Sequence, residues 1–292
     1  MTRTQRLPNP IVVTGCNAAH YDLVSDLLTS IDDVGRTGLT IGFVHVGEDE
    51  VPAEISGRVD RMVHVSDAAA APALRVGFPL AHLMIKARLP EFFPGHDTYV
   101  WLDGDTWVQN RVGLDQIIHC AQFADLCAHP ELDPNYHRER APNDRMLTVY
   151  QAYYGAEAAY RDVRLPQFNS GVFGARERSP LWAAWRETLT EIRQKVLETP
   201  GLYYSDQAPM HHLVATEKVK VYPLRAVNNW LLHASQPALN LARKRIVAPT
   251  YPHEEINILH MTWITKDATF RLGERDVSFR YRSIKALFAE TA

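Results

Sequence analysis

Apolar and polar residues follow two alternating patterns in the first third of the chain. Residues 22–31 carry leucines and an isoleucine at helical spacing, and residues 78–89 predict a second helix that ends at Pro90. Short runs rich in β-branched and aromatic residues, typical of buried strands, occupy residues 11–16, 39–46, 61–65 and 99–102. Strand and helix patterns that alternate in this way predict an α/β fold with a mixed, mainly parallel central sheet flanked by helices.

The middle of the chain departs from this alternation. Residues 129–145 are polar, contain three prolines and show neither a helical nor a strand period. A stretch of this length inside a compact domain is typical of a functional lid, and a disordered segment is the alternative. Further along, the pattern predicts helices at about 180–196 and 206–215 and strands at 171–175, 218–222 and 256–260.

Residues 267–292 form a basic tail. Its apolar residues at helical spacing are Val277, Tyr281, Ile284, Leu287 and Phe288. Its basic residues are Arg271, Arg275, Arg280, Arg282 and Lys285. We favour a terminal helix that packs on the domain and keeps a solvated basic face. Peripheral contact with an anionic membrane is the alternative.

Composition and charge narrow the class of protein. The 292 residues suit one large α/β domain, and 46% hydrophobic with 22% charged residues is ordinary for a globular protein. A net charge of −3 gives no support for nucleic-acid binding. The chain shows no signal-peptide pattern and no apolar run near the ~18 residues that span a bilayer. Three cysteines, Cys16, Cys120 and Cys127, indicate buried thiols in a reducing compartment, so we expect a cytoplasmic protein.

Two carboxylates, Asp103 and Asp105, follow the predicted strand at 99–102 and are separated by Gly104. In an open α/β sheet, ligands bind outside the carboxyl ends of the strands. The two acids repel each other unless a positive group lies between them, and their oxygens suit Mg²⁺ or Mn²⁺ with a substrate's phosphates. The glycine permits a sharp turn and close approach of a ligand. An ordinary turn and a phosphatase nucleophile are the alternatives, and Trp107 in place of the phosphatase threonine argues against the second.

Other polar residues accompany the apolar segments further along the chain. They are Lys86 and Arg88 on the helix before the acidic strand, Asn169 before a strand, Asp206 and Gln207 at a helix start, and His260 at a strand end with Lys266 six residues on. Each has a structural alternative. Asn169 can satisfy backbone groups, Asp206 can cap a helix, and His260 can be a hydrogen-bonded core histidine.

In their order and spacing these motifs resemble the glycosyltransferase A fold, and most closely family 8 of the retaining glycosyltransferases. That family has a strand ending in Asp-x-Asp, an Asn-[Ser/Ala]-Gly-Val segment, an Asp-Gln at a helix start and a late His-x5-Lys. All four occur here in that order across residues 11–266. The resemblance implies one Rossmann-like domain over residues 1–292, with a nucleotide-sugar-binding half at 10–128, an acceptor half at 129–266 and the basic tail at 267–292.

The resemblance also implies a role for each matched residue. Asp103, Asp105 and His260 would ligate Mn²⁺ or Mg²⁺, which would bridge the diphosphate of a nucleotide-sugar donor. The other donor contacts would come from Gly104, Lys266, Asn17 and either Lys86 or Arg88. The sugar and its reacting carbon would be lined by Asn169, Asp206 and Gln207. A UDP-sugar is the expected donor, and the acceptor would be a glycan, a lipid or a small molecule.

These residue types suit the chemistry of glycosyl transfer. The diphosphate gains negative charge as it leaves, and a divalent cation and a lysine stabilise that charge. In the retaining family the leaving phosphate is thought to serve as the base. In an inverting enzyme a carboxylate would have to reach the acceptor hydroxyl, and the candidates are Glu131, Asp133 and Asp144.

Two segments differ from the family pattern. The acid that usually precedes a tyrosine near the N-terminus is absent before Tyr21, where Asn17 could bind a base instead, so guanosine and thymidine donors stay open. After His260, Trp263 replaces a usual glycine.

Two other functions are alternatives to glycosyl transfer. A sugar nucleotidyltransferase would need a glycine-rich phosphate loop, which the first strand lacks. A non-catalytic sugar-nucleotide-binding relative would not need the intact acids.

Overall fold

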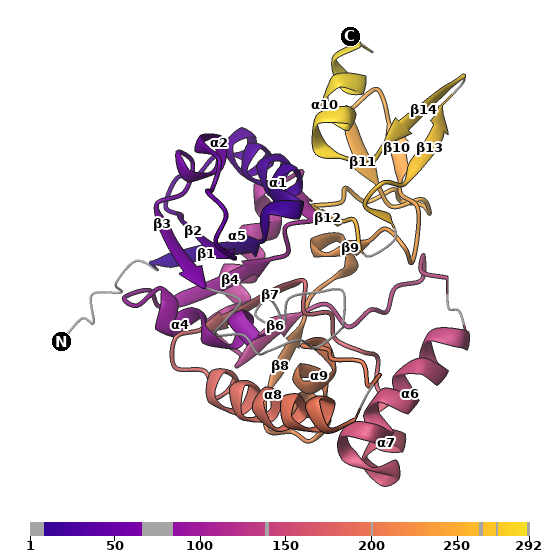
Figure 1. Cartoon of the computed structure of the whole chain (residues 1–292). Helices are drawn as coiled ribbons and strands as arrows, with labels where there is room; N and C mark the ends of the chain where they lie inside the picture. Colours follow the sequence, from indigo (N-terminus) through magenta and orange to yellow (C-terminus); the bar gives the residue numbers. More distant parts are fainter. Residues whose placement is uncertain are drawn as a thin grey trace, which may run out of the picture.

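The computed structural model describes residues 9–65, 84–137, 140–199, 201–262, 265–272 and 274–290, with the backbone alone at 140–145. Its central seven-stranded sheet has the order β3-β2-β1-β4-β7-β6-β8 (Figure 1). The strands are β1 (Pro10–Cys16), β2 (Thr40–Val46), β3 (Arg61–Val65), β4 (Thr98–Leu102), β6 (Leu126–Ala128), β7 (Val172–Arg176) and β8 (Val221–Pro223). Within this sheet β7 is antiparallel to both neighbours and every other pair is parallel. The predicted mixed, mainly parallel sheet is therefore confirmed.

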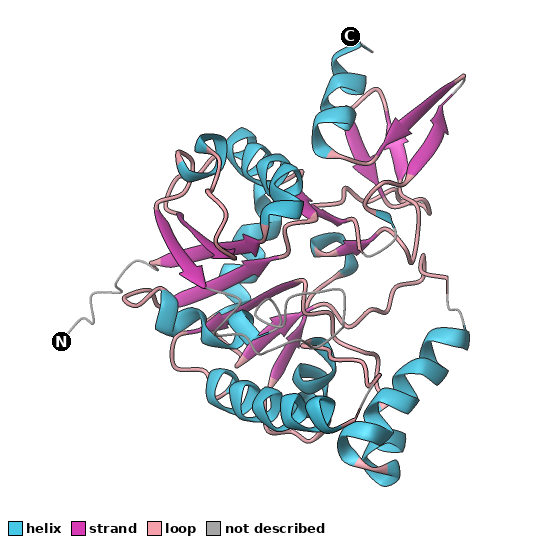
Figure 2. Cartoon of the chain, viewed as in Figure 1, coloured by secondary structure: helices cyan, strands magenta, loops and turns pink. Residues whose placement is uncertain are grey.

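Helices cover both faces of the sheet (Figure 2). One face packs against α1 (Tyr21–Val34), α2 (Ala53–Ser56) and α5 (Arg111–Ala121). The other packs against α4 (Leu89–Phe92), α6 (Arg140–Tyr154), α7 (Ala156–Asp162), α8 (Leu181–Glu198) and α9 (Gln207–Ala215). Alternation along β4 explains both contacts, because Tyr99 and Trp101 face the α8 side while Val100 and Leu102 face α1 and α5. The central strands of the sheet are thus buried on both sides.

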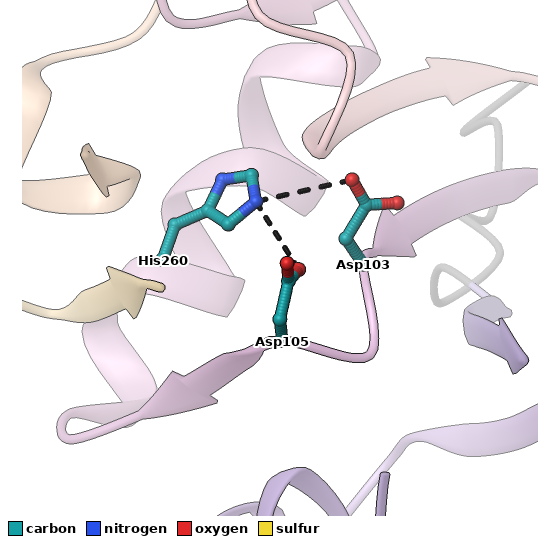
Figure 3. A group of neighbouring side chains, drawn as sticks. All are labelled: Asp103, Asp105 and His260. Atoms are coloured by element: carbon teal, nitrogen blue, oxygen red, sulfur yellow. Dashed lines mark ion pairs between the residues drawn. The ribbon is translucent and has the colours of Figure 1, made fainter. Parts of the chain in front are cut away.

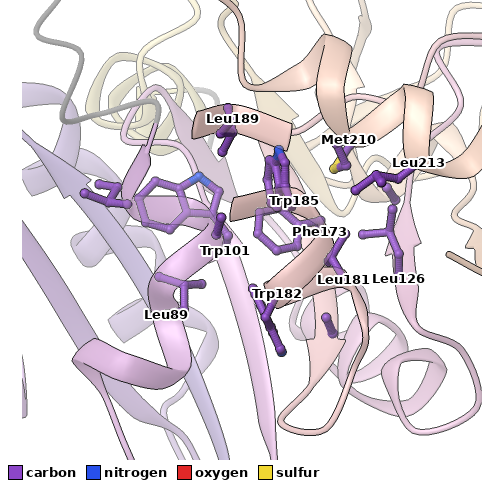
Figure 4. Packing of buried hydrophobic residues seen from close by; sticks show 14 of the residues in the cluster. Leu89, Trp101, Leu126, Phe173, Leu181, Trp182, Trp185, Leu189, Met210 and Leu213 are labelled. Atoms are coloured by element: carbon purple, nitrogen blue, oxygen red, sulfur yellow. The ribbon is translucent and has the colours of Figure 1, made fainter. Parts of the chain in front are cut away.

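Aromatic side chains fill the core on the α8 side. Figure 4 shows Trp101 of β4 and Phe173 of β7 among Trp182, Trp185 and other residues of α8 and α9. The rings of Phe173 and Trp185 lie 5.5 Å apart, edge to face, an arrangement that adds to the free energy gained by burial. This packing anchors β4 and β7, the two strands whose ends carry the acidic motif and the Asn169 segment.

A smaller sheet stands beside the large one. It has the order β5-β12-β9 and consists of β5 (Thr106–Val108), β9 (Trp230–Leu231) and β12 (Ile258–His260). Two hairpins, β10 (Ala238–Asn240) with β11 (Arg245–Val247) and β13 (Thr269–Leu272) with β14 (Arg275–Ser278), lie next to it with α10 (Tyr281–Glu290) (Figure 1). Trp107, Trp230 and Phe270 are among the residues of the shared third core.

Two predicted elements need correction. Pro90 does not end a helix: it lies in the first turn of α4, where its missing N–H has no intrahelical partner to lose. The helix α4 follows the 3₁₀ helix η3 (Lys86–Arg88). Residues 78–83 of the predicted helix lie outside the described residues. The polar segment 129–145 is also partly helical, because α6 begins at Arg140. The sequence of the first turns of α6 is polar and concealed the helix, and among its described side chains those that pack on the core start at Met146.

The basic tail is more structured than the helical spacing predicted, because Val277 belongs to β14 and only the last part of the segment is helical. Ile284, Leu287 and Phe288 of α10 are buried in the third core. Three of the basic side chains, Arg280, Arg282 and Lys285, pair with Asp22, Asp26 and Asp33 of α1. The pairing favours a packed terminal element over a membrane-binding tail. No helix in the described ranges combines the length and apolar character that crossing a bilayer requires.

Candidate active site

Strand pairing brings distant motifs together at the carboxyl edge of the large sheet. Leu102 at the end of β4 lies opposite Val172 at the start of β7, so Asp103 meets the segment before β7. The backbone N–H of Asp103 donates to the carbonyl of Gly171 at 2.7 Å. In the small sheet His260 lies opposite Thr106, which places its imidazole beside Asp105. The topology therefore assembles one site from residues spread over the chain.

Asp103, Asp105 and His260 form a group that can hold a metal ion (Figure 3). The Nε2 atom of His260 lies 3.3 Å from Asp105 Oδ1 and 3.9 Å from Asp103 Oδ2. One ligand atom from each residue lies within 4.8 Å of the other two. His260 is buried, Asp105 nearly so, and Asp103 is the most open of the three, with 29% of its side chain exposed. The two carboxylates are ligands that suit Mn²⁺ and Mg²⁺, the cations expected from the sequence, and the imidazole could supply a third ligand atom.

Two glycines leave room for this arrangement. A Cβ at Gly171 would lie 2.1 Å from Cε1 of His260 and 2.7 Å from Oδ2 of Asp103. Only glycine therefore permits the histidine and the acid to approach each other here. A Cβ at Gly104 would lie 2.9 Å from the Val24 side chain of α1. Gly104 is thus required by close packing against α1, in addition to the turn that the sequence suggested.

Lys86 is buried among acids. Its Nζ lies 2.9 Å from Asp103 Oδ1 and 2.8 Å from Asp206 Oδ2, and it donates to the carbonyl of Ser170 at 3.2 Å. Burial alone would lower the pKa of Lys86, but the two carboxylates outweigh it and raise this pKa above its ordinary value. The ammonium is therefore a fixed positive charge between the acidic motif and the start of α9.

The two acids of the motif have different electrostatic surroundings. Burial raises the pKa of Asp103, and Lys86 only partly offsets this effect. For Asp105, His260 and Lys266 outweigh the effect of burial and lower the pKa to about 2. Lys266 Nζ lies 3.3 Å from Asp105 Oδ2 and keeps 28% of its side chain exposed. The site thus keeps an ionised carboxylate with an accessible ammonium beside it.

Asn169, Gln207 and Glu131 form a hydrogen-bonded cluster next to the acids. The amide groups of Asn169 and Gln207 donate to Glu131 Oε1 at 2.8 and 3.0 Å, and Asn169 also donates to Gln207 Oε1 at 3.3 Å. Ser170 Oγ donates to Asp206 Oδ2 at 3.1 Å, which joins this cluster to Lys86. Burial raises the pKa of Glu131. The residues predicted to line the sugar, Asn169, Asp206 and Gln207, are therefore neighbours.

The side-chain hydrogen bonds of the other predicted residues go to residues outside this group. Arg88 donates to Glu91 at 2.8 Å and is 45% exposed, so Lys86 is the basic residue that reaches the acids. Asn17 shares a hydrogen bond with His20 Nδ1 at 2.9 Å, and both side chains are half-buried. Asp133 accepts hydrogen bonds from the backbone and amide of Asn135, as in a turn. The side chains of Asp144 and Trp263 lie outside the described residues.

Two polar residues at the site were not predicted. Asn229 is fully buried just before β9, and its side chain lies between Asn169 and His260. An asparagine pair directly before Trp-Leu-Leu was the available signal, because a buried amide needs polar partners. His20 follows β1 in the 3₁₀ helix η1 (Ala18–His20). Burial and the charge of Lys266 lower the pKa of His20, which places this imidazole within the field of the site.

Comparison with known proteins identifies the fold. No model of a protein family and no curated protein sequence matches this chain. Among solved structures, galactosyltransferase LgtC, in complex with donor and acceptor sugar analogues, is 14% identical, with 96% of this chain and 95% of that chain covered and a TM-score of 0.59. Mouse xyloside xylosyltransferase 1 in its apo form is 13% identical, with 87% and 98% covered and a TM-score of 0.56. The bifunctional glycosyltransferase WbbM is 12% identical, with 89% and 47% covered and a TM-score of 0.53. The chain therefore has the glycosyltransferase A fold, as its motifs predicted.

Proposed function

We propose that this protein is a metal-dependent glycosyltransferase of the family 8 type. It transfers a sugar from a nucleotide-diphosphate donor with retention of the sugar's anomeric configuration. We expect this donor to be a UDP-sugar. The acceptor would be a glycan, a lipid or a small molecule. The observation that carries the proposal is the convergence of Asp103, Asp105 and His260 with Lys86 and Lys266 at one edge of the sheet. The LgtC structure, which holds donor and acceptor sugar analogues, supports it by its shared fold.

The donor's diphosphate is the group that this edge suits. Asp103, Asp105 and His260 would hold Mn²⁺ or Mg²⁺, which when bound supplies positive charge that stabilises the departing diphosphate. Lys266, on the open side of Asp105, would contact a diphosphate oxygen directly. Gly104 would permit close approach of the donor, and Asn17 would lie toward its base. We assign residues 10–128 to the donor half and 129–266 to the acceptor half.

The sugar would lie against Asn169, Asp206 and Gln207. In transfer, the bond from the sugar's anomeric carbon to the phosphate oxygen breaks and a bond to the acceptor oxygen forms on the same face. The acceptor proton passes to the leaving phosphate, so no side-chain base is required. Asp206 and the two amides would fix the sugar hydroxyls, and their charge and dipoles would favour the oxocarbenium-like transition state.

A cytoplasmic location is part of the proposal. The free cysteines, of which Cys16 and Cys127 are buried, support it.

Donor turnover without an acceptor tests this proposal. Many transferases slowly transfer sugar to water, so we expect Mn²⁺-dependent release of sugar from at least one member of a panel of UDP-, GDP- and TDP-sugars. The Asp206→Asn variant should bind the donor but release sugar much more slowly. No release from any donor, with donor binding intact, would instead identify a non-catalytic sugar-nucleotide-binding protein.

A further inference from the structure

Asn229 links the candidate cation site to the residues on the sugar side. It has no exposed surface and directly precedes β9, the strand that pairs with β12 beside His260. Its Nδ2 lies 3.0 Å from Asn169 Oδ1, and its Oδ1 lies 3.0 Å from His260 Nδ1. One buried amide therefore touches both a proposed metal ligand and a proposed sugar-binding residue.

The backbone fixes which way each amide is turned. The N–H of Gly171 is a donor only, and it donates to Asn169 Oδ1 at 2.9 Å, so this atom is the amide oxygen. The Asn229 atom that faces it must be the NH₂ group, and the carbonyl oxygen of Asn229 must face His260. Since that oxygen can only accept, His260 Nδ1 carries a proton. The assignment agrees at the other end, where Asn169 Nδ2 faces the carboxylate of Glu131.

This hydrogen bond decides what His260 presents to the acids. With its proton held on Nδ1, the imidazole turns Nε2 toward Asp105 at 3.3 Å and Asp103 at 3.9 Å. A neutral imidazole with its proton on Nε2 would have no lone pair for a cation on that side. Partners of this kind fix the orientation of metal-bound histidines, and their loss typically costs about 10–100-fold in metal affinity.

We propose that Asn229 is a positioning residue, which holds His260 with Nδ1 protonated and Nε2 aimed at the cation and ties that ligand to Asn169. The inference rests on the proposed function and goes beyond it. Because Asn229 touches neither the acids nor a group that reacts, it acts through His260 and Asn169. A shift of His260 at the cation site would therefore be transmitted, through this chain of hydrogen bonds, to the amides proposed to line the sugar.

Two variants separate its contacts. Asn229→Leu, of similar size, removes both hydrogen bonds, whereas Asn229→Asp keeps an acceptor for His260 and loses the donor to Asn169. Asn228→Leu is the matched control, because Asn228 is also buried and bonds to Gln116 and Asn257 without touching the site. With Mn²⁺ titrated in the presence of inorganic pyrophosphate, we expect about tenfold or greater loss of Mn²⁺ affinity for Asn229→Leu alone. Asn229→Asp should keep the cation affinity but lower kcat with a sugar donor.

Proton NMR on ¹⁵N-histidine-labelled, metal-free protein provides an independent test. The wild type should show a protected Nδ1–H signal that disappears in His260→Gln and in Asn229→Leu but persists in Asn228→Leu. Absence of this signal in the wild type, or full Mn²⁺ affinity in folded Asn229→Leu, would overturn the inference. If the wild type binds no Mn²⁺, the proposed function fails, while the NMR signal still decides whether Asn229 fixes the imidazole.

Discussion

The ammonium group of Lys86 lies 2.8 Å from the carboxylate of Asp206, and this ion pair joins η3 to the start of α9. The same ammonium lies 2.9 Å from Asp103, the first acid of the Asp-Gly-Asp motif. One buried ammonium group thus forms ion pairs with both the proposed metal ligand Asp103 and the proposed sugar-binding acid Asp206. It therefore holds the two carboxylates close to each other.

Removing this charge should damage both stability and activity. Lys86→Met leaves Asp206 and Asp103 without their shared cation, and breaking a buried ion pair costs on the order of 3 kcal/mol. We expect that loss in urea unfolding, and a loss of about 100-fold or more in kcat/KM. Arg88→Met is the control, because this exposed side chain bonds to Glu91, and it should change both quantities little. Equal effects of the two variants would refute the role given to Lys86.

Crowding at Gly171 should disable the cation site without unfolding the protein. In Gly171→Ala the new methyl group would displace His260 and Asp103, so we expect about tenfold or greater loss of Mn²⁺ affinity by calorimetry. Gly174→Ala is the matched control three residues further along, inside β7, since its methyl group would meet Ile117 in the core at 2.6 Å. That variant should lose stability and keep its affinity for Mn²⁺. Normal Mn²⁺ binding by Gly171→Ala would contradict the site's geometry.

The stereochemistry of transfer tests the role of Glu131. Its Oε1 accepts from both Asn169 and Gln207, so in a retaining enzyme it holds the amides and takes no proton. Glu131→Gln keeps an acceptor oxygen, and we expect its rate to stay within about tenfold of the wild type, with the donor's anomeric configuration retained in the product by NMR. A loss of about 100-fold or more with an inverted product would identify Glu131 as a general base.

His129 should make the folded state sensitive to acid. Burial lowers the pKa of this histidine from 6.5 to about 4, so the unfolded chain takes up a proton at a higher pH than the folded protein does. Its contribution to stability is therefore complete above pH 6.5 and decreases as the pH falls toward 4, by up to about 3 kcal/mol. In urea unfolding, His129→Phe should show a shallower decrease over this range. Identical slopes would show that His129 is not buried in its neutral form.

The sequence predicted the centre of the large sheet well because β1, β2 and β4 are buried on both faces. Continuous apolar runs mark β1, β2 and β4, and they need no knowledge of their partners. Strands as short as β5, β6 and β9 escaped prediction, because two or three residues show no period. Their pairing is set by the tertiary fold, and so is the small sheet that brings His260 to Asp105.

The site was predictable where a motif carried its own chemistry. Asp103 and Asp105 could be picked out from residue type and spacing, and the resemblance of the motifs added His260, which the structure places beside them. Asn229 could not, because its role depends on two hydrogen bonds to residues far away in the sequence. The choice between Lys86 and Arg88 likewise depended on which side of a 3₁₀ helix faces the acids.

Isothermal titration of UDP and GDP, with and without Mn²⁺, tests the central claim most directly. We expect the wild type to bind one of these nucleotides, UDP above all, much more tightly when Mn²⁺ is present. The double variant Asp103→Ala/Asp105→Ala should lose this enhancement while remaining folded. If neither nucleotide binds, or if binding ignores Mn²⁺ and survives the double substitution, the Asp-Gly-Asp motif does not hold a metal-bound nucleotide-sugar and the account is wrong.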